Sequence, residues 1–335
     1  MRQSRLETAL QGGTLILPET GRMAVLAPVE GDDLSDLPKD RVTVVQGFRP
    51  DHDAFARQGY RVVVSAEPPF AAALVCLPRS RSKGKALVAQ AAALVGAGGL
   101  VLVDGQKTDG IDTMLRDCKA RVAIGGPVVK AHGRLFWFHA SGDFADWAAL
   151  AEPRRIDAGF LTGAGVFSAG HVDEGSAALI AALPPKLGSK VADLGAGWGY
   201  LAAEILKRPT VNVMYLVEAD HAALELAKQN ITDPRARFHW DDARSFRPPH
   251  KLDAVVMNPP FHQGRDADPG LGIAFIRAAA AMLTPGGVLW MVANRHLPYQ
   301  GALDAAFREV TVAATAPGFR IFRAARPVHE SRKPG

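Results

Sequence analysis

Cysteine is nearly absent from this chain: its 335 residues include only Cys76 and Cys118. Neither belongs to a CxxC pair or a Cys/His cluster, so a disulfide scaffold is excluded and a structural zinc site is disfavoured. We therefore expect no bound metal. The first residues also lack the apolar segment of a secretion signal. We expect a cytoplasmic protein that acts as a monomer.

An uninterrupted hydrophobic run of membrane-spanning length is also missing. The nearest approach is residues 86–103, in which Gln90 is the only polar side chain. Glycines interrupt this stretch at Gly96, Gly98 and Gly99. A bilayer span needs about 20 consecutive apolar residues. The stretch therefore predicts a buried helix, a glycine turn and a short core strand.

Charge of one sign is only mildly in excess. The chain has 39 Lys and Arg against 34 Asp and Glu, a formal net charge of +5. This excess permits a polyanionic partner but does not require one, because a globular protein can be this basic without such a partner. With 48% hydrophobic and 22% charged residues, the composition is that of a globular protein. The length fits about two domains of roughly 150 residues each.

Strand and helix patterns alternate along the second half of the chain. Such alternation predicts an α/β fold, in which helices cover both faces of a mostly parallel sheet. The loops that follow the strands then lie along one edge of the sheet, where ligands bind. The predicted strands are residues 190–194, 211–217, 252–257 and 288–293, and residues 236–238 are a short apolar stretch. The predicted helices are residues 200–207, 222–230 and 273–283, and residues 310–314 and 320–323 form a closing hairpin.

The first half of the chain repeats features of the second. Residues 94–103 resemble residues 282–291, since both lead from an apolar helix through a Gly-Gly turn into an apolar strand. Residues 133–138 resemble residues 318–323 in the same order and at nearly the same offset. We interpret the chain as a tandem pair of similar α/β domains. The two domains are predicted to be residues 1–155 and 156–335.

The sharpest local signal follows the first predicted strand of the second half. Asp193 is followed by glycines at alternate positions, Gly195, Gly197 and Gly199, and a helix begins after them. Glycines let the backbone approach a ligand closely, and the start of a helix offers free N–H groups. A dinucleotide turn has the spacing G-x-G-x-x-G instead, and a carboxylate would repel its pyrophosphate. We interpret this turn as the site of a nucleoside that carries an amino acid, whose ammonium can donate to Asp193; a plain structural turn is the alternative.

Acidic residues follow the next two strands. Glu218 ends its strand, and a carboxylate there suits the two hydroxyls of a ribose. Asp220 is the alternative, although it fits better as a helix N-cap. Further on, Asp241 or Asp242 can accept a hydrogen bond from the amine of adenine. We favour Asp242; a solvated acidic loop is the alternative.

The sequence Asn258-Pro259-Pro260-Phe261 follows the predicted strand 252–257. Its two prolines fix the backbone, so that the Pro259 carbonyl can point rigidly into a cleft. Asn258 supplies a side-chain acceptor, and Phe261 supplies a flat apolar face. A planar base with an exocyclic NH2 fits this arrangement, with both acceptors on its N–H groups and its ring stacked on the phenyl ring. A proline turn capped by Asn is the structural alternative.

At these residues the chain resembles the class I S-adenosylmethionine-dependent methyltransferases that act on exocyclic or amide nitrogens. Residues 165–176, 258–264 and 293–299 are similar to the bacterial ribosomal RNA guanine-N2 methyltransferases, in particular to the ribosomal small-subunit methyltransferase C family. The resemblance covers residues 160–326. It implies S-adenosylmethionine as cofactor, ribosomal RNA or a ribosomal subunit as partner, and methylation of a guanine N2. It also implies two tandem Rossmann-like methyltransferase domains, of which the N-terminal one is degenerate.

The first half fits the description of a degenerate copy. Its strand 71–76 corresponds to residues 252–257, so that Leu77 stands where Asn258 would and offers no amide acceptor. No glycine triplet follows residues 25–27. Four basic residues crowd the loop beside the former cleft, and we expect them to grip RNA phosphates; a solvated charged loop is the alternative. They are Arg79, Arg81, Lys83 and Lys85.

Two other functions stay open. The first is another N-methyltransferase with the same Asn-Pro-Pro-Phe sequence, acting on guanine N2 of the large subunit, on adenine N6 or on a protein glutamine. The degenerate first domain and residues 293–299 count against the last two. The second is a non-catalytic ribosome-assembly factor. The intact Asn258-Pro259-Pro260-Phe261 counts against it, because an inactive site does not need this sequence.

Overall fold

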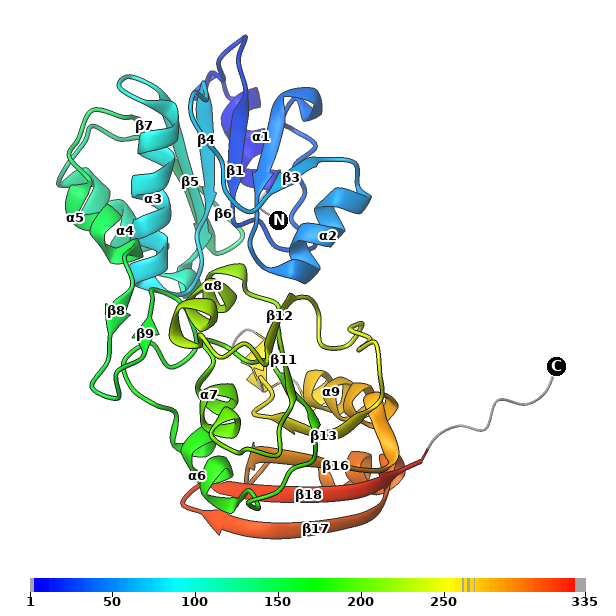
Figure 1. The fold of residues 1–335 in the computed structure, drawn as a ribbon. Coiled ribbons are helices and arrows are strands. Elements are labelled where there is room, and N and C mark those ends of the chain that lie inside the picture. The colour runs from blue at the N-terminus through cyan, green and yellow to red at the C-terminus, as the bar shows by residue number, and fades with distance from the viewer. Residues whose placement is uncertain (1–2, 261, 264–265, 268, 329–335) are drawn as a thin grey trace. The chain divides into compact units, whose positions relative to one another are not determined.

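The computed structural model describes residues 3–260, 262–263, 266–267 and 269–328 and is drawn in Figure 1. The chain divides into two compact units. The first unit comprises residues 1–153 and 163–165, and the second comprises residues 154–162 and 166–335.

The first unit is built on a seven-stranded sheet with the order β3-β2-β1-β4-β5-β7-β6. Strands from β3 to β5 are parallel, and β7 is antiparallel to both of its neighbours. The strands are β1 (Met23–Leu26), β2 (Val42–Val45), β3 (Arg61–Val63), β4 (Ala72–Cys76), β5 (Leu100–Gln106), β6 (Gly125–Lys130) and β7 (Gly133–His139). The α-helices are α1 (Gln3–Gln11), α2 (Arg49–Arg57), α3 (Arg81–Val95), α4 (Ile111–Lys119) and α5 (Ala145–Ala148), and short 3-10 helices span Lys39–Arg41, Lys107–Asp109 and Ala149–Ala151.

The second unit is built on a seven-stranded sheet with the order β12-β11-β10-β13-β16-β18-β17. Its strands are β10 (Lys190–Leu194), β11 (Val213–Glu218), β12 (Ala236–Trp240), β13 (Leu252–Met257), β16 (Leu283–Asn294), β17 (Phe307–Ala316) and β18 (Phe319–Pro327). Its helices are α6 (Glu174–Ala182), α7 (Tyr200–Leu206), α8 (His221–Asn230), α9 (Pro269–Met282) and α10 (Gln300–Ala306). Two further strand pairs are β8 (Arg154–Arg155) with β9 (Leu161–Thr162), and β14 (His262–Gln263) with β15 (Asp266–Ala267).

The two large sheets share one topology. In each, three parallel strands lie on one side of the fourth, and an antiparallel hairpin follows the fifth. β1 therefore corresponds to β10, β4 to β13, and β5 to β16. This confirms the prediction of two tandem α/β folds with mostly parallel sheets, including the closing hairpin.

Strand β10 shows why the predicted strands are short apolar runs. Leu194 packs in one core cluster with Ile276 of α9. Val191 packs in another with Ile205 of α7. Because successive side chains of a strand point to opposite faces, α9 covers one face of the sheet and α7 covers the other. Strands buried on both faces are apolar at nearly every position.

Some element boundaries differ from the prediction. The helix expected over residues 273–283 begins at Pro269, since proline is well tolerated in a first helical turn. The strand expected to begin at residue 211 is β11, which begins at Val213 and ends at Glu218 as predicted. Among the helices of the described residues, we find none with the length and hydropathy that a bilayer span requires.

A buried ion pair ties helix α1 to the first sheet. Arg5 is fully buried and donates to both carboxylate oxygens of Asp104 in β5, at 2.6 and 3.1 Å. It also donates to the carbonyl of Lys130 in β6 at 3.0 Å. A Cβ on Gly133 would collide with the guanidinium, so the neighbouring strand needs glycine there. The pair therefore joins three elements of the first unit.

Replacing Arg5 tests the contribution of this pair. Arg5→Met leaves Asp104 buried without its cation, and we expect the free energy of unfolding of the first unit to fall by about 3–5 kcal/mol. Arg49→Met is the control, since it breaks a partly exposed pair with Asp53 within α2, and we expect a loss below about 1 kcal/mol. Hydrogen exchange at the amides of β5 measures both. Equal losses would contradict this account.

Candidate active site

Parallel register brings the predicted site residues of the second unit to one edge. β10 pairs with β11 and with β13, and β11 pairs with β12, all in parallel. Asp193 lies level with Val256 of β13, and Glu218 lies level with Trp240 of β12. The glycine turn, the two acidic loops and the Asn-Pro-Pro turn therefore all leave the sheet at the carboxyl ends of its strands. Ligands bind at this edge in open α/β sheets.

The glycine turn depends on glycine at each of its three positions. Gly195, Gly197 and Gly199 have φ values of 77°, 54° and 94°, which other residues rarely adopt. A Cβ on Gly199 would lie 2.9 Å from Cδ1 of Ile231. A Cβ on Gly197 would meet no atom within 4 Å, so the space beside this residue is open. The turn thus offers a ligand bare backbone.

Glu218 is fixed against this turn. Its Oε2 accepts the N–H of Gly197 at 2.8 Å, and its Oε1 accepts the N–H of Asp220 at 2.7 Å. Burial raises the pKa of Glu218 above its ordinary value. Each carboxylate oxygen keeps a second lone pair, which suits a ligand with two adjacent hydroxyls. Asp220 caps α8, as predicted, by accepting from the N–H of Ala222 at 2.9 Å.

Asp193 is a buried acid whose carboxylate lacks hydrogen-bond partners. It is 0% exposed, and neither of its side-chain oxygens has a partner of normal hydrogen-bond geometry among the described residues. Burial, together with the neighbouring Glu218 carboxylate, raises the pKa of Asp193 to about 8, although the backbone N–H of Ala202 acts on it to lower the pKa. An unpaired buried acid is costly unless it is neutral or finds a partner. A cation bound beside the turn would supply that partner.

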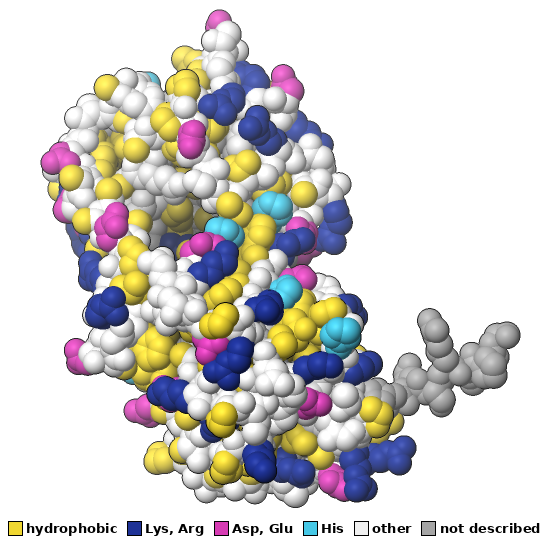
Figure 2. Space-filling view, in the orientation of Figure 1, with side chains coloured by type: hydrophobic (Ala, Val, Ile, Leu, Met, Phe, Trp, Pro, Cys, Tyr) yellow, Lys and Arg dark blue, Asp and Glu magenta, His cyan; other side chains and the backbone are white. Residues whose placement is uncertain are grey.

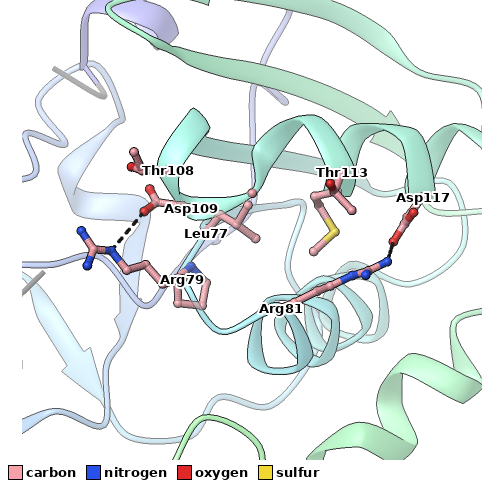
Figure 3. Close-up of a pocket in the computed structure, with 10 residues that line it drawn as sticks. Leu77, Arg79, Arg81, Thr108, Asp109, Thr113 and Asp117 are labelled. Atoms are coloured by element: carbon pink, nitrogen blue, oxygen red, sulfur yellow. Dashed lines mark hydrogen bonds and ion pairs between the residues drawn. The ribbon is translucent and has the colours of Figure 1, made fainter. Parts of the chain in front are cut away.

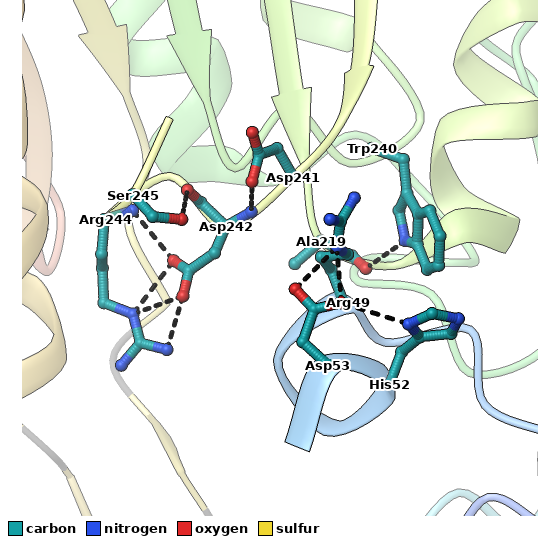
Figure 4. Close-up of polar contacts among 9 residues, drawn as sticks. All are labelled: Arg49, His52, Asp53, Ala219, Trp240, Asp241, Asp242, Arg244 and Ser245. Atoms are coloured by element: carbon teal, nitrogen blue, oxygen red, sulfur yellow. Dashed lines mark hydrogen bonds and ion pairs between the residues drawn. The ribbon is translucent and has the colours of Figure 1, made fainter. Parts of the chain in front are cut away.

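In the loop after β12, both acidic side chains already have hydrogen-bond partners (Figure 4). Asp242 is held by the guanidinium of Arg244, with Nε–O distances of 3.0 and 2.8 Å. One oxygen of Asp241 accepts the N–H of Asp242 at 2.8 Å. A hydrogen bond from adenine to Asp242 would therefore share the carboxylate with Arg244. Although acids gather here, no group of three or more His, Cys, Asp or Glu in the described part of the chain is placed to hold a metal ion.

The turn after β13 lies beside the glycine turn. Asn258 is partly buried, Pro259 is buried and Pro260 is exposed. A Cβ on Gly195 would lie 4.0 Å from Cδ of Pro260, so the two turns are in contact range. Phe261, predicted to stack on a base, lies outside the described residues.

Two contacts that sequence reasoning did not assign hold the Asn258 side chain. Its Nδ2 donates to Oδ2 of Asp173 at 2.8 Å and to Oγ of Ser176 at 2.9 Å. Asp173 also caps α6 by accepting the N–H of Ser176. The sequence signal was the acid three residues before Ser176 at the start of an apolar run, which indicates an N-cap.

A second unassigned contact joins the segment before α6 to the glycine turn. The indole of Trp198 donates to the carbonyl of Phe167 at 3.0 Å. Nδ2 of Asn230 donates to the carbonyls of both Leu161 and Trp198 at 2.9 Å. Trp198 therefore has a structural role, because its hydrogen bonds hold the glycine turn in shape.

The basic residues of the first unit are placed differently from the prediction. Only Arg79 lies in the loop after β4, because Ser80 caps α3 and the other three residues lie in the first turns of that helix. A cavity of about 200 Å³ opens at the carboxyl ends of β4 and β5 (Figure 3). Around it, Arg79 lies 3.9 Å from Asp109, and Arg81 and Lys85 each lie 3.0 Å from Asp117. These three cations are partly neutralised within their own unit.

Comparisons with known proteins decide the family. The family described as methyltransferase small domain matches residues 157–323. The ribosomal RNA small subunit methyltransferase C of Pseudomonas aeruginosa (strain LESB58) is 31% identical over 273 residues, which are 77% of this chain and 80% of that protein. The chain belongs to the ribosomal RNA small subunit methyltransferase C family. This confirms the resemblance seen in the sequence.

Other members and relatives of the family match over shorter stretches. The enzyme of the same name from Hahella chejuensis is 33% identical over 57% of this chain and 56% of its own length. The ribosomal RNA large subunit methyltransferase G of Alcanivorax borkumensis is 34% identical over 60% of this chain and 53% of its own length. The chain thus spans about half the length of these two relatives.

A solved member of the small subunit methyltransferase C family shares the fold of the whole chain. It is the 16S rRNA N2 G1207 methyltransferase of T. thermophilus, in complex with AdoMet and guanosine. The TM-score is 0.79 at 24% sequence identity, and the match covers 93% of this chain and 90% of that one. The two-unit architecture is therefore that of the family.

The raised pKa of Asp193 predicts a pH dependence of stability. The pKa of this carboxyl is about 8 in the folded protein against an ordinary value of 3.8, so folding takes up a proton between these pH values. The wild type then loses stability as the pH rises through this window, by up to about 1.4 kcal/mol per pH unit. Asp193→Asn lacks the titration. Hydrogen exchange at the amides of β10, corrected for intrinsic rates, measures the free energy of unfolding of both proteins. As the pH rises, this free energy should increase in the variant relative to the wild type. A constant difference would refute the assignment.

Proposed function

We propose that this protein transfers a methyl group from S-adenosylmethionine to the exocyclic N2 of a guanine in small-subunit ribosomal RNA. The observation that carries the proposal is that the glycine turn and the turn of Asn258 and Pro259 follow adjacent parallel strands and lie side by side at one sheet edge. One turn suits a nucleoside with an amino acid, and the other suits a planar base with an amine. Family membership supports the pairing of these two ligands. The proposal includes a cytoplasmic monomer.

The acidic residues at the ends of β10, β11 and β12 suit S-adenosylmethionine. The two unpartnered oxygens of the buried Asp193 suit the ammonium of the amino-acid part, either directly or through water. The free lone pairs of Glu218 suit the ribose hydroxyls. The carboxylate of Asp242 or Asp241, in the loop after β12, suits the adenine amine, and Asp242 would share its carboxylate between adenine and Arg244. When bound, the group supplies an electrophilic methyl on a positively charged sulfur.

Asn258 and Pro259 act on the amine of the substrate, whose low nucleophilicity is the main obstacle to the reaction. The lone pair of a guanine N2 is delocalised into the ring, so the nitrogen is a poor nucleophile. Two carbonyl acceptors on its N–H groups orient the amine and favour the pyramidal nitrogen as positive charge develops. This is positioning with electrostatic preorganisation, and no strong base is required. Since N2 takes part in Watson–Crick pairing, the target guanine must be unpaired or flipped out.

The match to a large subunit methyltransferase G keeps guanine N2 of the large subunit as a second candidate substrate. Incubation with methyl-labelled S-adenosylmethionine separates the candidates. The substrates are small subunits, large subunits, naked ribosomal RNA and transfer RNA from a strain without this protein. We expect label in small-subunit RNA. Label only in large subunits, in adenine or in a protein would show that the substrate is a different one. No label despite cofactor binding would favour a ribosome-assembly factor.

Asn258→Ala tests the role of the amide acceptor. Removing one preorganised polar group of this kind lowers kcat by about 10²–10³-fold, and we expect a loss in that range. The affinity for S-adenosylmethionine, measured by calorimetry, should stay within about twofold because the amide contacts the base. Asn212→Ala is the control, because this residue is exposed and precedes β11. An unchanged rate in Asn258→Ala would show that the amide is not catalytic.

We propose further that the first unit binds RNA phosphates through Arg79, Arg81, Lys83 and Lys85. The absence of an amide acceptor at Leu77 supports a non-catalytic role for this unit. On the face drawn in Figure 2, Lys and Arg side chains are spread among acidic ones and form no single basic stripe. Binding would therefore draw on a few local contacts and shift Arg81 and Lys85 from Asp117 to phosphate.

The salt dependence of RNA binding tests this role. Each phosphate contact contributes roughly 0.7–0.9 to the slope of log affinity against log salt, so replacing all four residues with Ala should flatten the slope by about two or more. The control replaces four other exposed cations of the first unit and removes the same charge. An equal loss of slope in both variants would mean that only net charge matters. The control residues are Arg57, Arg116, Lys119 and Lys130.

A further inference from the structure

The start of helix α6 contacts the Asn258 side chain across the second unit. Asp173 is the N-cap of α6, and its Oδ2 accepts the N–H of Ser176 at 2.8 Å. The same Oδ2 accepts from Nδ2 of Asn258 at 2.8 Å, and Oγ of Ser176 lies 2.9 Å from that nitrogen. A capping pair therefore also forms a clamp around the amide nitrogen. Asn258 lies more than 80 positions after the capping pair in the sequence, and only the fold brings them together.

The chemistry of the clamp fixes which way the amide points. An amide nitrogen carries two N–H donors, and an ionised carboxylate has only acceptors. Both donors of Asn258 have a partner in the clamp, so its nitrogen faces α6 and its carbonyl oxygen faces away. Turning the amide over would set its oxygen against Oδ2 of Asp173 with no proton between them and would lose that hydrogen bond, whereas the Ser176 hydroxyl can donate as well as accept. Asp173 therefore decides the orientation.

The local sequence leaves room for this arrangement. Ser176 is buried at 7% exposure, so its hydroxyl is held in place by its surroundings. A Cβ on Gly175 would lie 3.1 Å from Oδ2 of Asp173 and 2.9 Å from Cε1 of Phe319. Glycine between the two clamp residues therefore keeps the carboxylate free to reach Asn258. On the other side, Pro259 restricts the backbone that carries the amide.

We propose that Asp173 and Ser176 are positioning residues, which hold the Asn258 amide with its carbonyl oxygen toward the amine of the substrate. The inference rests on the proposed function, since a fixed acceptor matters only for a substrate that donates. Neither residue is assigned contact with the base. Their effect on methyl transfer passes through Asn258.

Three substitutions separate positioning from capping and from charge. Asp173→Ser keeps an N-cap hydroxyl but is too short to reach Asn258, and Ser176→Ala removes the second acceptor. We expect each to lower kcat by about ten- to hundredfold, as for other small misplacements of a catalytic group. Asp173→Asn keeps a carbonyl acceptor and should retain most of the activity. If the Asp173 carboxylate instead accepted a proton during the reaction, this substitution would abolish the activity. Asp143→Ser, which alters a turn at the start of α5, should leave kcat within about twofold.

A double-mutant cycle gives the decisive kinetic readout. In the Asn258→Ala background, Asp173→Ser and Ser176→Ala should cause no further loss of kcat, because the group they position is gone. Undiminished losses in that background would show a purely structural role and overturn the proposal.

The side-chain NH2 of Asn258 gives a readout that needs no substrate. Its two proton signals are assigned in the nitrogen-15 spectrum by their loss in Asn258→Ala. We expect slow exchange in the wild type, with faster exchange of one proton in Ser176→Ala and of one in Asp173→Ser. Unchanged exchange in both variants would refute the clamp, whatever RNA the protein methylates. The expected exchange together with no methylation of any RNA would instead refute the proposed function.

Discussion

The candidate site depends on one constraint, the parallel register of four neighbouring strands. β12, β11, β10 and β13 each end in a polar or glycine-containing loop, and the register makes these ends level. A shift of one strand by one residue would turn its side chains to the other face and break the core packing on both sides of β10. Packing of the sheet therefore sets the places from which the site loops start, and side-chain hydrogen bonds such as those of Glu218 and Asn258 then hold the loops in shape.

The two units show that this constraint permits different residues at the edge of the sheet. β4 holds the place of β13 in an equal topology, yet it is followed by Leu77 instead of Asn258. Where the second unit has an amide and an open glycine turn, the first has a cavity bordered by Arg–Asp pairs. The fold survives this exchange because the core residues stay apolar. The proposed chemistry depends on a few side chains at the edge, and the first unit lacks the amide among them.

Much of this could be predicted from the sequence, because the signals are local. The alternation of apolar strands and helices gave the fold, and the glycines at alternate positions proved to have positive φ values. The cap at Asp220 followed from its place before an apolar helix. Each of these features is decided by residues that are close neighbours in the chain.

Of the features that the sequence did not reveal, one depends on contacts between distant segments and two depend on local contacts within a loop or at a helix start. The clamp on Asn258 joins residues from two distant segments, and only packing of α6 against the sheet reveals it. Arg81, Lys83 and Lys85 lie in the first turns of α3 and not in a loop, because Ser80 caps this helix. The pairing of Asp242 with Arg244 depends on the backbone path of the loop after β12, which the sequence does not specify.

The most direct test of the central claim is the methylated nucleoside in the cell. Small-subunit RNA from a strain lacking this protein is digested and analysed by mass spectrometry, before and after complementation with the wild type or with Asn258→Ala. The account predicts N2-methylguanosine that is absent from the deletion strain, restored by the wild type and not restored by the variant. Restoration by both proteins, or no change in this nucleoside, would contradict it.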